Sequence, residues 1–329
     1  MPAHESPILV TGAAGFIGAH VCAALLARGE RVIGLDNFND YYDPQLKRDR
    51  VAALCPALAI EAVDIADAAA LTQVFATHQP SRVLHLAAQA GVRYSLEAPA
   101  VYVQSNLVGF ANVLEACRQA ATAHLVYASS SSVYGGGALP PFSEDQRIDR
   151  PLSLYAATKV ANEAMAHAYA HLYRLALTGL RFFTVYGPWG RPDMAPILFV
   201  RAALAGRPIE VFNQGAMRRD FTWIGDIVAG VLAALDRPPT DDGSAAPQRV
   251  FNLGNSKPVA LLHFIDTIEA AVGRPLARIL KPMQPGDMAE TMADTRAAEQ
   301  ALGFRPHTGI EQGLPQLVDW CRGYYAGRA

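Results

Sequence analysis

A tyrosine and a lysine stand four residues apart in the segment Tyr155-Ala-Ala-Thr-Lys159. On a helix, this spacing brings the phenol and the ammonium to one face. A neighbouring ammonium stabilises a phenolate and lowers the pKa of a tyrosine from about 10 toward neutrality. An isolated pair of this kind is commonly a surface helix pair, but here we expect Tyr155 to act as a general base on an alcohol proton, with Lys159 as its partner.

A run of four serines, Ser129 to Ser132, offers hydroxyl groups that can assist such a base. The run follows an apolar segment typical of a buried strand. The carboxyl ends of parallel strands are the usual ligand edge of an α/β sheet, so these hydroxyls are expected to gather there. The residues alone leave open whether Ser130, Ser131 or Ser132 takes part in catalysis.

Three glycines, Gly12, Gly15 and Gly18, lie between the first apolar segment and a helical one. This spacing and context are typical of a turn whose backbone approaches a pyrophosphate closely, with the phosphates at a helix N-terminus. Asp36 ends the second expected strand, where its carboxylate can accept both ribose hydroxyls and repel a 2′-phosphate, which favours NAD over NADP. Asp64 ends the third expected strand, where it is placed to meet the adenine. The alternative is that Asp64 is a solvated acid of the loop.

The expected cofactor contacts share the loops that follow these first strands, and Tyr155 and Lys159 complete them. They are Gly12, Gly15, Phe16, Ile17, Gly18, Asp36, Asp64, Ile65, Leu86, Ala87 and Ala88. We expect Lys159 to hold the nicotinamide ribose while the positive nicotinamide ring, like the ammonium, favours the phenolate.

The elements that position these residues alternate between short apolar runs and helical periodicity. Strands are predicted at 7–11, 31–36, 58–64, 82–87, 124–129 and 177–184, with helices at 15–28, 67–78, 102–121 and 154–175. Such alternation predicts an α/β fold, a Rossmann-like doubly wound parallel sheet. We expect residues 1–184 to form the NAD-binding domain, joined by parts of 221–255, and residues 185–329 to form mainly a smaller α/β substrate domain.

Composition excludes several classes of function. A net charge of -2 argues against nucleic-acid binding, and the chain has no apolar run long enough to span a membrane. Met1–Ser6 lack the features of a signal peptide, and Cys22, Cys55, Cys117 and Cys321 show no paired spacing, so a cytoplasmic protein with reduced cysteines is expected. The nine histidines show no ligand spacing, so no metal site is expected.

Taken in this order, the glycine loop, Asp36, the serine run and Tyr155/Lys159 resemble the extended short-chain dehydrogenase/reductase family, also called the NAD-dependent epimerase/dehydratase family. Within it the chain is most similar to UDP-glucuronate 4-epimerases. The likeness covers nearly the whole chain, and its longest matching segments are 35–43, 151–159, 179–194, 217–222, 285–288 and 303–306.

The resemblance implies a role for each of several further residues. Counted back from Val-Tyr-Gly, Ser130 occupies the position of the catalytic hydroxyl in related galactose epimerases. Arg219 would meet the UDP phosphates, Asp287 the uridine ribose, and Arg191 a second phosphate or a ribose. Related enzymes are mostly homodimers joined through two helices, for which 102–121 and 154–175 are the candidates.

Two residues at the expected ligand edge fit a substrate that carries a carboxylate as well as two phosphates. Arg93 follows the fourth strand and is either a ligand contact or a solvated charge. Thr184 ends a strand where related neutral-sugar epimerases usually carry Asn, and its hydroxyl can bind the carboxylate; the alternative is a local backbone cap. Trp223, Gly225 and Arg150 depart from the family pattern near this side of the site.

The implied activity is the NAD-dependent interconversion of UDP-glucuronate and UDP-galacturonate. Hydride transfer would pass through a UDP-4-keto-hexuronic acid, without decarboxylation. A UDP-glucuronate decarboxylase is a rival, although families of that kind carry acids between the tyrosine and lysine where this chain has Ala-Ala-Thr. A UDP-glucose/UDP-galactose 4-epimerase is a second rival. An NAD-sensing regulatory protein is the alternative outside enzymes.

Overall fold

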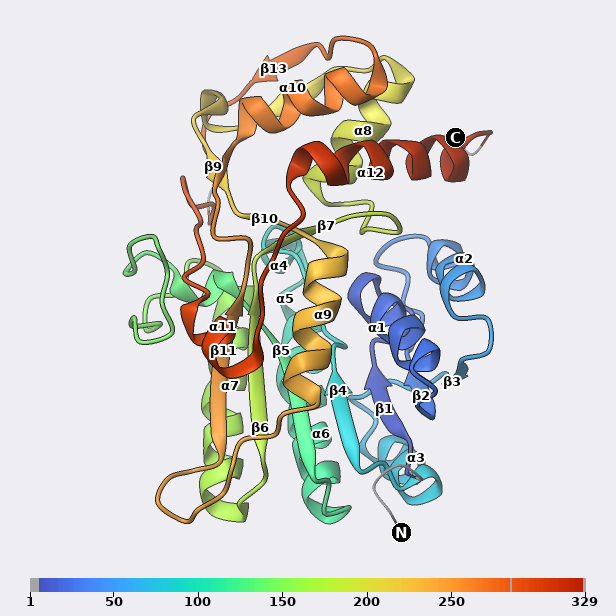
Figure 1. Ribbon diagram of the computed structural model, residues 1–329, viewed down its shortest axis with the longest axis vertical. Coiled ribbons are helices and arrows are strands. Elements are labelled where there is room, and N and C mark those ends of the chain that lie inside the picture. Colours follow the sequence, from blue (N-terminus) through green and yellow to red (C-terminus); the bar gives the residue numbers. More distant parts are fainter. Residues whose placement is uncertain (1–5, 285, 328–329) are drawn as a thin grey trace.

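Seven parallel strands form the central sheet of the computed structural model, which describes residues 6–284 and 286–327 (Figure 1). Two sets of residues named above lie outside the described residues. They are residues 1–5 of the N-terminal segment that lacks signal-peptide features, and Pro285 of the 285–288 motif. The strands are β1 (Ile8–Thr11), β2 (Val32–Leu35), β3 (Ala59–Glu61), β4 (Arg82–His85), β5 (His124–Ser130), β6 (Leu177–Phe182) and β11 (Gln248–Leu253). Their order is β11-β6-β5-β4-β1-β2-β3, so chain order reverses between β1 and β4, where such sheets bind ligands.

The strands are nearly continuous apolar runs because both faces of the sheet are covered. In β1, Ile8 and Val10 enter one hydrophobic core and Leu9 enters the other, as the two-residue period of a strand requires. The predicted doubly wound parallel sheet is therefore confirmed.

Helices pack on both faces, as Figure 1 shows. One face carries α1 (Phe16–Ala27), α9 (Ile224–Leu235) and α11 (Arg296–Leu302), with α2 (Pro44–Leu54) against α1. The other carries α3 (Ala68–His78), α6 (Gly109–Gln119) and α7 (Leu154–Tyr173). All four cysteines are buried and free, as expected. Among the described residues, no helix is both long and apolar enough to cross a bilayer.

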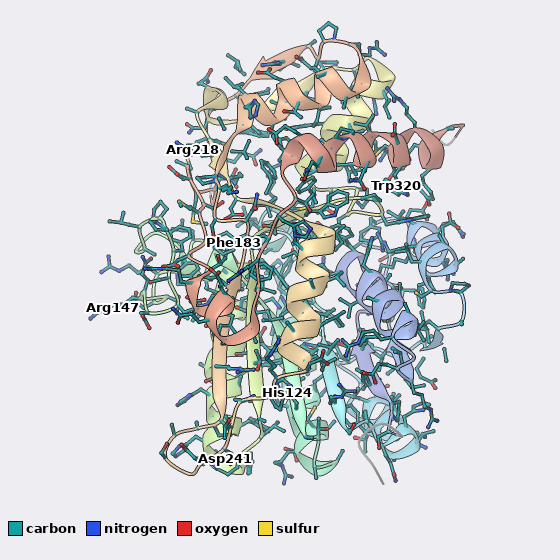
Figure 2. All side chains as sticks on the ribbon, in the orientation of Figure 1. His124, Arg147, Phe183, Arg218, Asp241 and Trp320 are labelled. Atoms are coloured by element: carbon teal, nitrogen blue, oxygen red, sulfur yellow. The ribbon has the colours of Figure 1, made fainter. Side chains whose placement is uncertain are left out.

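A second, smaller core lies beyond the carboxyl ends of the strands. Its helices are α8 (Ala195–Ala205), α10 (Leu261–Val272) and α12 (Ile310–Tyr325). Paired short strands complete it: β7 (Thr184–Tyr186) with β10 (Phe221–Trp223), β8 (Ile209–Val211) with β13 (Arg278–Leu280), and β9 (Arg218–Arg219) with β12 (Val259–Ala260). Trp320 on α12 and Arg218 on β9, both labelled in Figure 2, belong to this part.

Two predicted elements are interrupted. The helix expected over 102–121 is divided into α5 (Pro99–Tyr102), the π-helix η1 (Val103–Val108) and α6. Inside η1, the Asn106 side chain accepts a hydrogen bond from the Gln89 amide (2.8 Å) and donates to Thr158 (3.0 Å). A π-helix adds a residue to the turn and is frequent at functional sites. The third strand is also shorter than the predicted 58–64, since β3 covers only Ala59–Glu61.

The strand predicted over 177–184 divides at Phe183, which Figure 2 labels at the junction of the two parts. The backbone amide of Phe183 donates a hydrogen bond of 3.1 Å to the carbonyl of Leu253 in β11, the strand that pairs with β6. The backbone amide of Thr184 donates instead to the carbonyl of Asp220, also at 3.1 Å. The chain thus changes hydrogen-bond partners between these residues. Thr184 begins β7 rather than ending β6, so the expected strand-end position was wrong.

Candidate active site

A cavity of about 1050 Å³ lies between the carboxyl edge of the large sheet and the smaller core. Every residue that the sequence predicted for the site lines it: the glycine loop, Asp36, Asp64, the loop after β4, the serines, Tyr155, Lys159, Thr184, the three arginines and Asp287. Residues separated by more than two hundred positions therefore share one space. Their individual roles stay predictions.

The glycine loop has the close backbone packing that only glycine permits. Gly12 has a φ of +69°, and a Cβ there would lie 2.7 Å from the Ala87 nitrogen. A Cβ on Gly18 would collide with the Gly12 carbonyl oxygen, which fixes how closely α1 approaches β1. Because α1 begins at Phe16 without a capping side chain, its first amides and positive dipole end suit a pyrophosphate. The loop therefore fits a dinucleotide such as NAD.

Asp36 lies just beyond β2, and only 6% of its surface is exposed. Its carboxylate accepts hydrogen bonds from the amides of Ala14 (3.1 Å) and Phe38 (2.9 Å), which fix its orientation beside the glycine loop. Asp64 accepts a hydrogen bond from the Asn37 side chain at 2.9 Å. These two acids surround the part of the cavity where the adenosine end of NAD is expected.

Sequence reasoning missed two buried basic residues of α2. Lys47 lines the cavity, and its ammonium lies 3.7 Å from the Asp36 carboxylate. Arg50, which is fully buried, donates to the Ala14 carbonyl of the glycine loop and to the Trp189 carbonyl (2.9 Å). Lys47 and Arg50 share the inner face of α2 with Leu46. Basic residues placed three apart on an apolar helix face are the signal that could have revealed them.

The Tyr155 phenol lies in the first turn of α7 and interacts with the Ser130 hydroxyl at the end of β5. Ser130 in turn accepts hydrogen bonds from both the amide (3.2 Å) and the hydroxyl (2.9 Å) of Ser132. Ser129 is directed elsewhere, toward Glu163. Ser130 is therefore the hydroxyl in contact with the candidate base, Ser132 orients it, and Ser131 lines the cavity beside them.

Lys159 lies one helical turn beyond Tyr155, with 2% of its surface exposed. Its ammonium donates a 2.8 Å hydrogen bond to the Ala128 carbonyl. Burial lowers the pKa of Lys159 to about 8, against the opposing influence of Glu163. Lys159 is thus held at the carboxyl end of β5, next to the serines.

The expected lowering of the Tyr155 pKa toward neutrality does not occur in the protein by itself. Burial raises the pKa of Tyr155 above its ordinary value because desolvation disfavours the phenolate. The opposing influences are the Ser130 hydroxyl and the positive charge of Arg191. The spacing of Tyr155 and Lys159 is therefore not sufficient by itself to produce the phenolate.

Two of the cations that line the cavity, Arg93 and Arg219, lie near Asp287. The Arg93 guanidinium is 4.0 Å from the Asp287 carboxylate and lies 4.8 Å from the centre of the Phe212 ring. Arg219 donates to the Ala289 carbonyl at 3.2 Å, and burial lowers its pKa although Asp287 opposes this. A partly buried cation beside one carboxylate is suited to an anionic ligand.

Arg191 and Thr184 also line the cavity. Arg191 forms an ion pair with Asp193 at 2.5 Å, and its charge acts on the Tyr155 phenol. Asp193 also accepts a 3.0 Å hydrogen bond from Tyr41, which joins this turn to the loop after β2. Thr184 is half-buried at the cavity wall, with its amide bonded to Asp220.

A glycine-rich turn after β1, an acid after β2 and a tyrosine, lysine and serine at the carboxyl edge together define an NAD-binding protein of the extended short-chain dehydrogenase/reductase class. The chain belongs to the NAD dependent epimerase/dehydratase family, whose sequence profile matches residues 8–254.

Curated relatives and solved structures agree with this family. UDP-glucuronate 4-epimerase 3 of Arabidopsis thaliana is 51% identical over 97% of this chain and 77% of its own length. A probable UDP-glucuronate 4-epimerase of Rhizobium meliloti is 46% identical over 95% of this chain and 96% of its own. UDP-glucuronic acid 4-epimerase from Bacillus cereus, solved with UDP-glucuronic acid and NAD, is 33% identical and covers 97% of this chain and 100% of its own, with a TM-score of 0.89.

Proposed function

We propose that this protein is an isomerase, an NAD-dependent 4-epimerase that interconverts UDP-glucuronate and UDP-galacturonate. The observation that supports this function most directly is that Tyr155 and Ser130 share one cavity with three arginines, Arg93, Arg191 and Arg219. A UDP-uronic acid has two phosphates and a carboxylate, so its binding site needs several cations. The similarity to UDP-glucuronate 4-epimerases over nearly the whole chain supports the same substrate.

The two parts of the molecule are proposed to divide the ligands between them. Residues 1–184, joined by parts of 221–255, would hold NAD, and residues 185–329 would hold mainly the UDP-sugar. The packing of α9 on the large sheet and the pairing of β11 with β6 in that sheet support this assignment. The glycines, Asp36 and the loop after β4 would contact the cofactor, whereas Arg219, Arg93 and Asp287 would contact the UDP group.

In the proposed reaction, Tyr155 removes the proton from the C4 hydroxyl of the sugar, and Ser130 hydrogen bonds to the same oxygen. Bound NAD+ supplies the hydride acceptor and a positive ring that favours the phenolate. Lys159 holds the adjacent ribose and keeps a positive charge near Tyr155. The 4-keto sugar then turns within the cavity, and Tyr155 returns the proton after the opposite face has been reduced.

The 4-ketone is β to the C5 carboxylate, an arrangement prone to lose CO2. The site must therefore hold the carboxylate so that the bond to CO2 stays out of alignment with the ketone π system. We propose that the Thr184 hydroxyl and a hydroxyl from Ser130 to Ser132 do this. Thr184 and these serines line the same cavity as Tyr155, which supports the role. A hydroxyl orients the carboxylate without adding a charge that would immobilise the sugar.

The proposed function is tested by incubating the purified protein with UDP-glucuronate and following the sugar H4 and H5 signals by NMR, without added reductant. Growth of UDP-galacturonate to a steady mixture, without CO2 release, is the expected result. Appearance of a UDP-pentose would reassign the protein as a decarboxylase. Turnover of UDP-glucose alone would reassign it as a neutral-sugar epimerase. Absence of any turnover would favour an NAD-sensing protein.

We also propose that the protein is a homodimer that works in the cytoplasm. Exposed apolar side chains on α5, η1 and the end of α7 support a helical interface; they are Val101, Val103, Val108, Leu172 and Tyr173. The four free cysteines suit a reducing compartment. Light scattering would give twice the chain mass for the dimer and a single chain mass if the proposal fails.

A further inference from the structure

The buried guanidinium of Arg50 joins the glycine loop to the turn between β7 and α8. Its Nε donates to the Trp189 carbonyl at 2.9 Å, and one terminal nitrogen donates to the Ala14 carbonyl at 2.5 Å and to the Tyr42 hydroxyl at 3.2 Å. These acceptors are neutral, and they offset the desolvation cost of a fully buried cation only in part. Stability alone therefore gives little reason for an arginine at this position.

The turn that Arg50 reaches is held in an unusual backbone conformation at Trp189. The φ of Trp189 is +63°, a region that bulky residues rarely adopt. Such a conformation persists only where the surroundings hold the residue on several sides. The indole ring packs against Trp320 and Tyr324 of α12, with ring centres 5.1 and 4.9 Å away. Arg50 holds the carbonyl of the same residue from α2.

The position of Trp189 bears on the active site because Arg191 follows it by two residues. Arg191 lines the cavity, and its charge acts on the Tyr155 phenol. A guanidinium is planar and its donors point in fixed directions, so Arg50 sets the separation of the Ala14 and Trp189 carbonyls. The arginine on the substrate side of the cavity is thereby tied to the backbone of the glycine loop.

We propose that Arg50 is a positioning residue for the UDP-sugar site, which holds the Trp189 turn against the glycine loop and so keeps Arg191 in place to bind the substrate. Without its two hydrogen bonds to carbonyls, Trp189 relaxes to an ordinary backbone conformation and Arg191 moves with it. The inference rests on the proposed function for the identity of the ligand. The arrangement of the turn does not depend on that ligand, and it is tested separately.

Hydrogen–deuterium exchange of the holoprotein tests the turn without any sugar. In Arg50→Met, the peptide that contains residues 187–194 should exchange about tenfold faster than in the native protein, whereas β1, β4 and β5 should keep their protection. Unchanged exchange at the turn would overturn the proposal. Equal acceleration in the turn and the strands would also overturn it, because Arg50 would then support the fold as a whole.

Tyr324→Phe provides the matched control. It removes a 2.8 Å hydrogen bond to Asp49, the neighbour of Arg50 on α2, but keeps the ring that packs against Trp189. It therefore breaks another contact between α2 and the smaller core, and exchange at the turn should stay native. Acceleration equal to that of Arg50→Met would count against a specific role for the guanidinium.

Binding of UDP-glucuronate tests the link to Arg191. Dissociation constants are measured by calorimetry on holoprotein that carries Tyr155→Phe, so that the ligand is not turned over. Arg50→Met and Arg191→Met should each weaken binding about tenfold. The two together should be little weaker than Arg191→Met alone, because the group that Arg50 positions is then already absent.

Fully additive losses, or native affinity in either single variant, would overturn the positioning role. If the protein binds no UDP-glucuronate at all, the proposed function fails, and the exchange experiment still decides whether Arg50 holds the turn. Arg50→Lys keeps the charge, but its one nitrogen replaces a fork that reaches two carbonyls. It should show both changes at smaller size, and it replaces Arg50→Met if thermal unfolding shows that variant to be unfolded.

Discussion

Arg181 binds Glu163 through two hydrogen bonds, of 2.9 Å to one carboxylate oxygen and 2.7 Å to the other. Both residues are buried, and Glu163 lies one helical turn beyond Lys159 on α7. Glu163 also accepts a hydrogen bond from Ser129 at 2.5 Å. The carboxylate that favours the charged form of Lys159 is thus fixed to β5 and β6, the two strands that end at Ser130 and at Phe182.

Replacing Glu163 by Gln should change the pH dependence of turnover. Burial lowers the pKa of Lys159 to about 8, and Glu163 opposes that shift. Without the carboxylate the pKa falls further, so activity that needs the ammonium is lost at lower pH on the alkaline side. A pH–rate profile measures this shift.

The same substitution leaves the buried charge of Arg181 without its partner, which costs about 3–5 kcal/mol of stability. The profile is therefore recorded well below the unfolding temperature. Glu163→Asp, which keeps the charge, should restore most of the alkaline limb. An unchanged profile in a folded Glu163→Gln protein would show that Glu163 has no influence on Lys159.

Tyr155→Phe should lower the rate of epimerisation about 10²–10⁴-fold, because the phenol oxygen that takes the C4 proton is removed. The fold and the bound NAD should remain, since the ring and its packing are kept. Tyr169→Phe is the matched control: it lies on the same helix and hydrogen bonds to Glu115 outside the cavity. Turnover is measured by NMR on UDP-glucuronate, and an active Tyr155→Phe protein would require another base.

Thr184→Ala should increase the share of decarboxylated product about tenfold, because a hydrogen bond to a charged group contributes about 1.5–3 kcal/mol. Thr184→Ser keeps the hydroxyl and should retain the native ratio of UDP-galacturonate to UDP-pentose. The two products are resolved by NMR or chromatography. An unchanged ratio in Thr184→Ala would exclude the proposed hold on the carboxylate.

Gly18→Ala should reduce the amount of NAD that copurifies with the protein and lower its melting temperature. The added Cβ would meet the Gly12 carbonyl oxygen, so α1 would have to move away from the turn that faces the phosphates. Gly323→Ala in α12 is the control, since a Cβ there has open space around it and alanine favours a helix. Native NAD content in a folded Gly18→Ala protein would contradict the role given to the loop.

The sequence was most informative where the chemistry is local. The requirement for glycine at Gly12 and Gly18 follows from backbone packing within one turn, and the structure has that packing. The sheet was predictable because its strands are buried on both faces and therefore apolar throughout. The π-helix around Asn106 was not, since its extra residue depends on contacts with Gln89 and Thr158 rather than on periodicity.

Contacts between residues distant in sequence account for the other differences between the expected and the observed structure. Phe183 and Thr184 continue one apolar run, and only the positions of Leu253 and Asp220 determine where the strand leaves the sheet. Lys47 lies near Asp36 because the loop between them folds back, and the spacing of Lys47 and Arg50 on α2 does not indicate this pairing. The rise in the pKa of Tyr155 reflects burial by residues distant in sequence.

The position of β11 in the sheet limits how the protein can be divided into fragments. This strand comes late in the chain, yet it pairs with β6 along six residues and closes that side of the sheet. A fragment ending at residue 184 would leave β6 with an open row of amides and carbonyls, together with apolar side chains that α9 normally covers. Such a fragment is expected to aggregate. Because β6 and β11 run parallel, a soluble cofactor-binding unit would have to keep a crossover between them that includes α9.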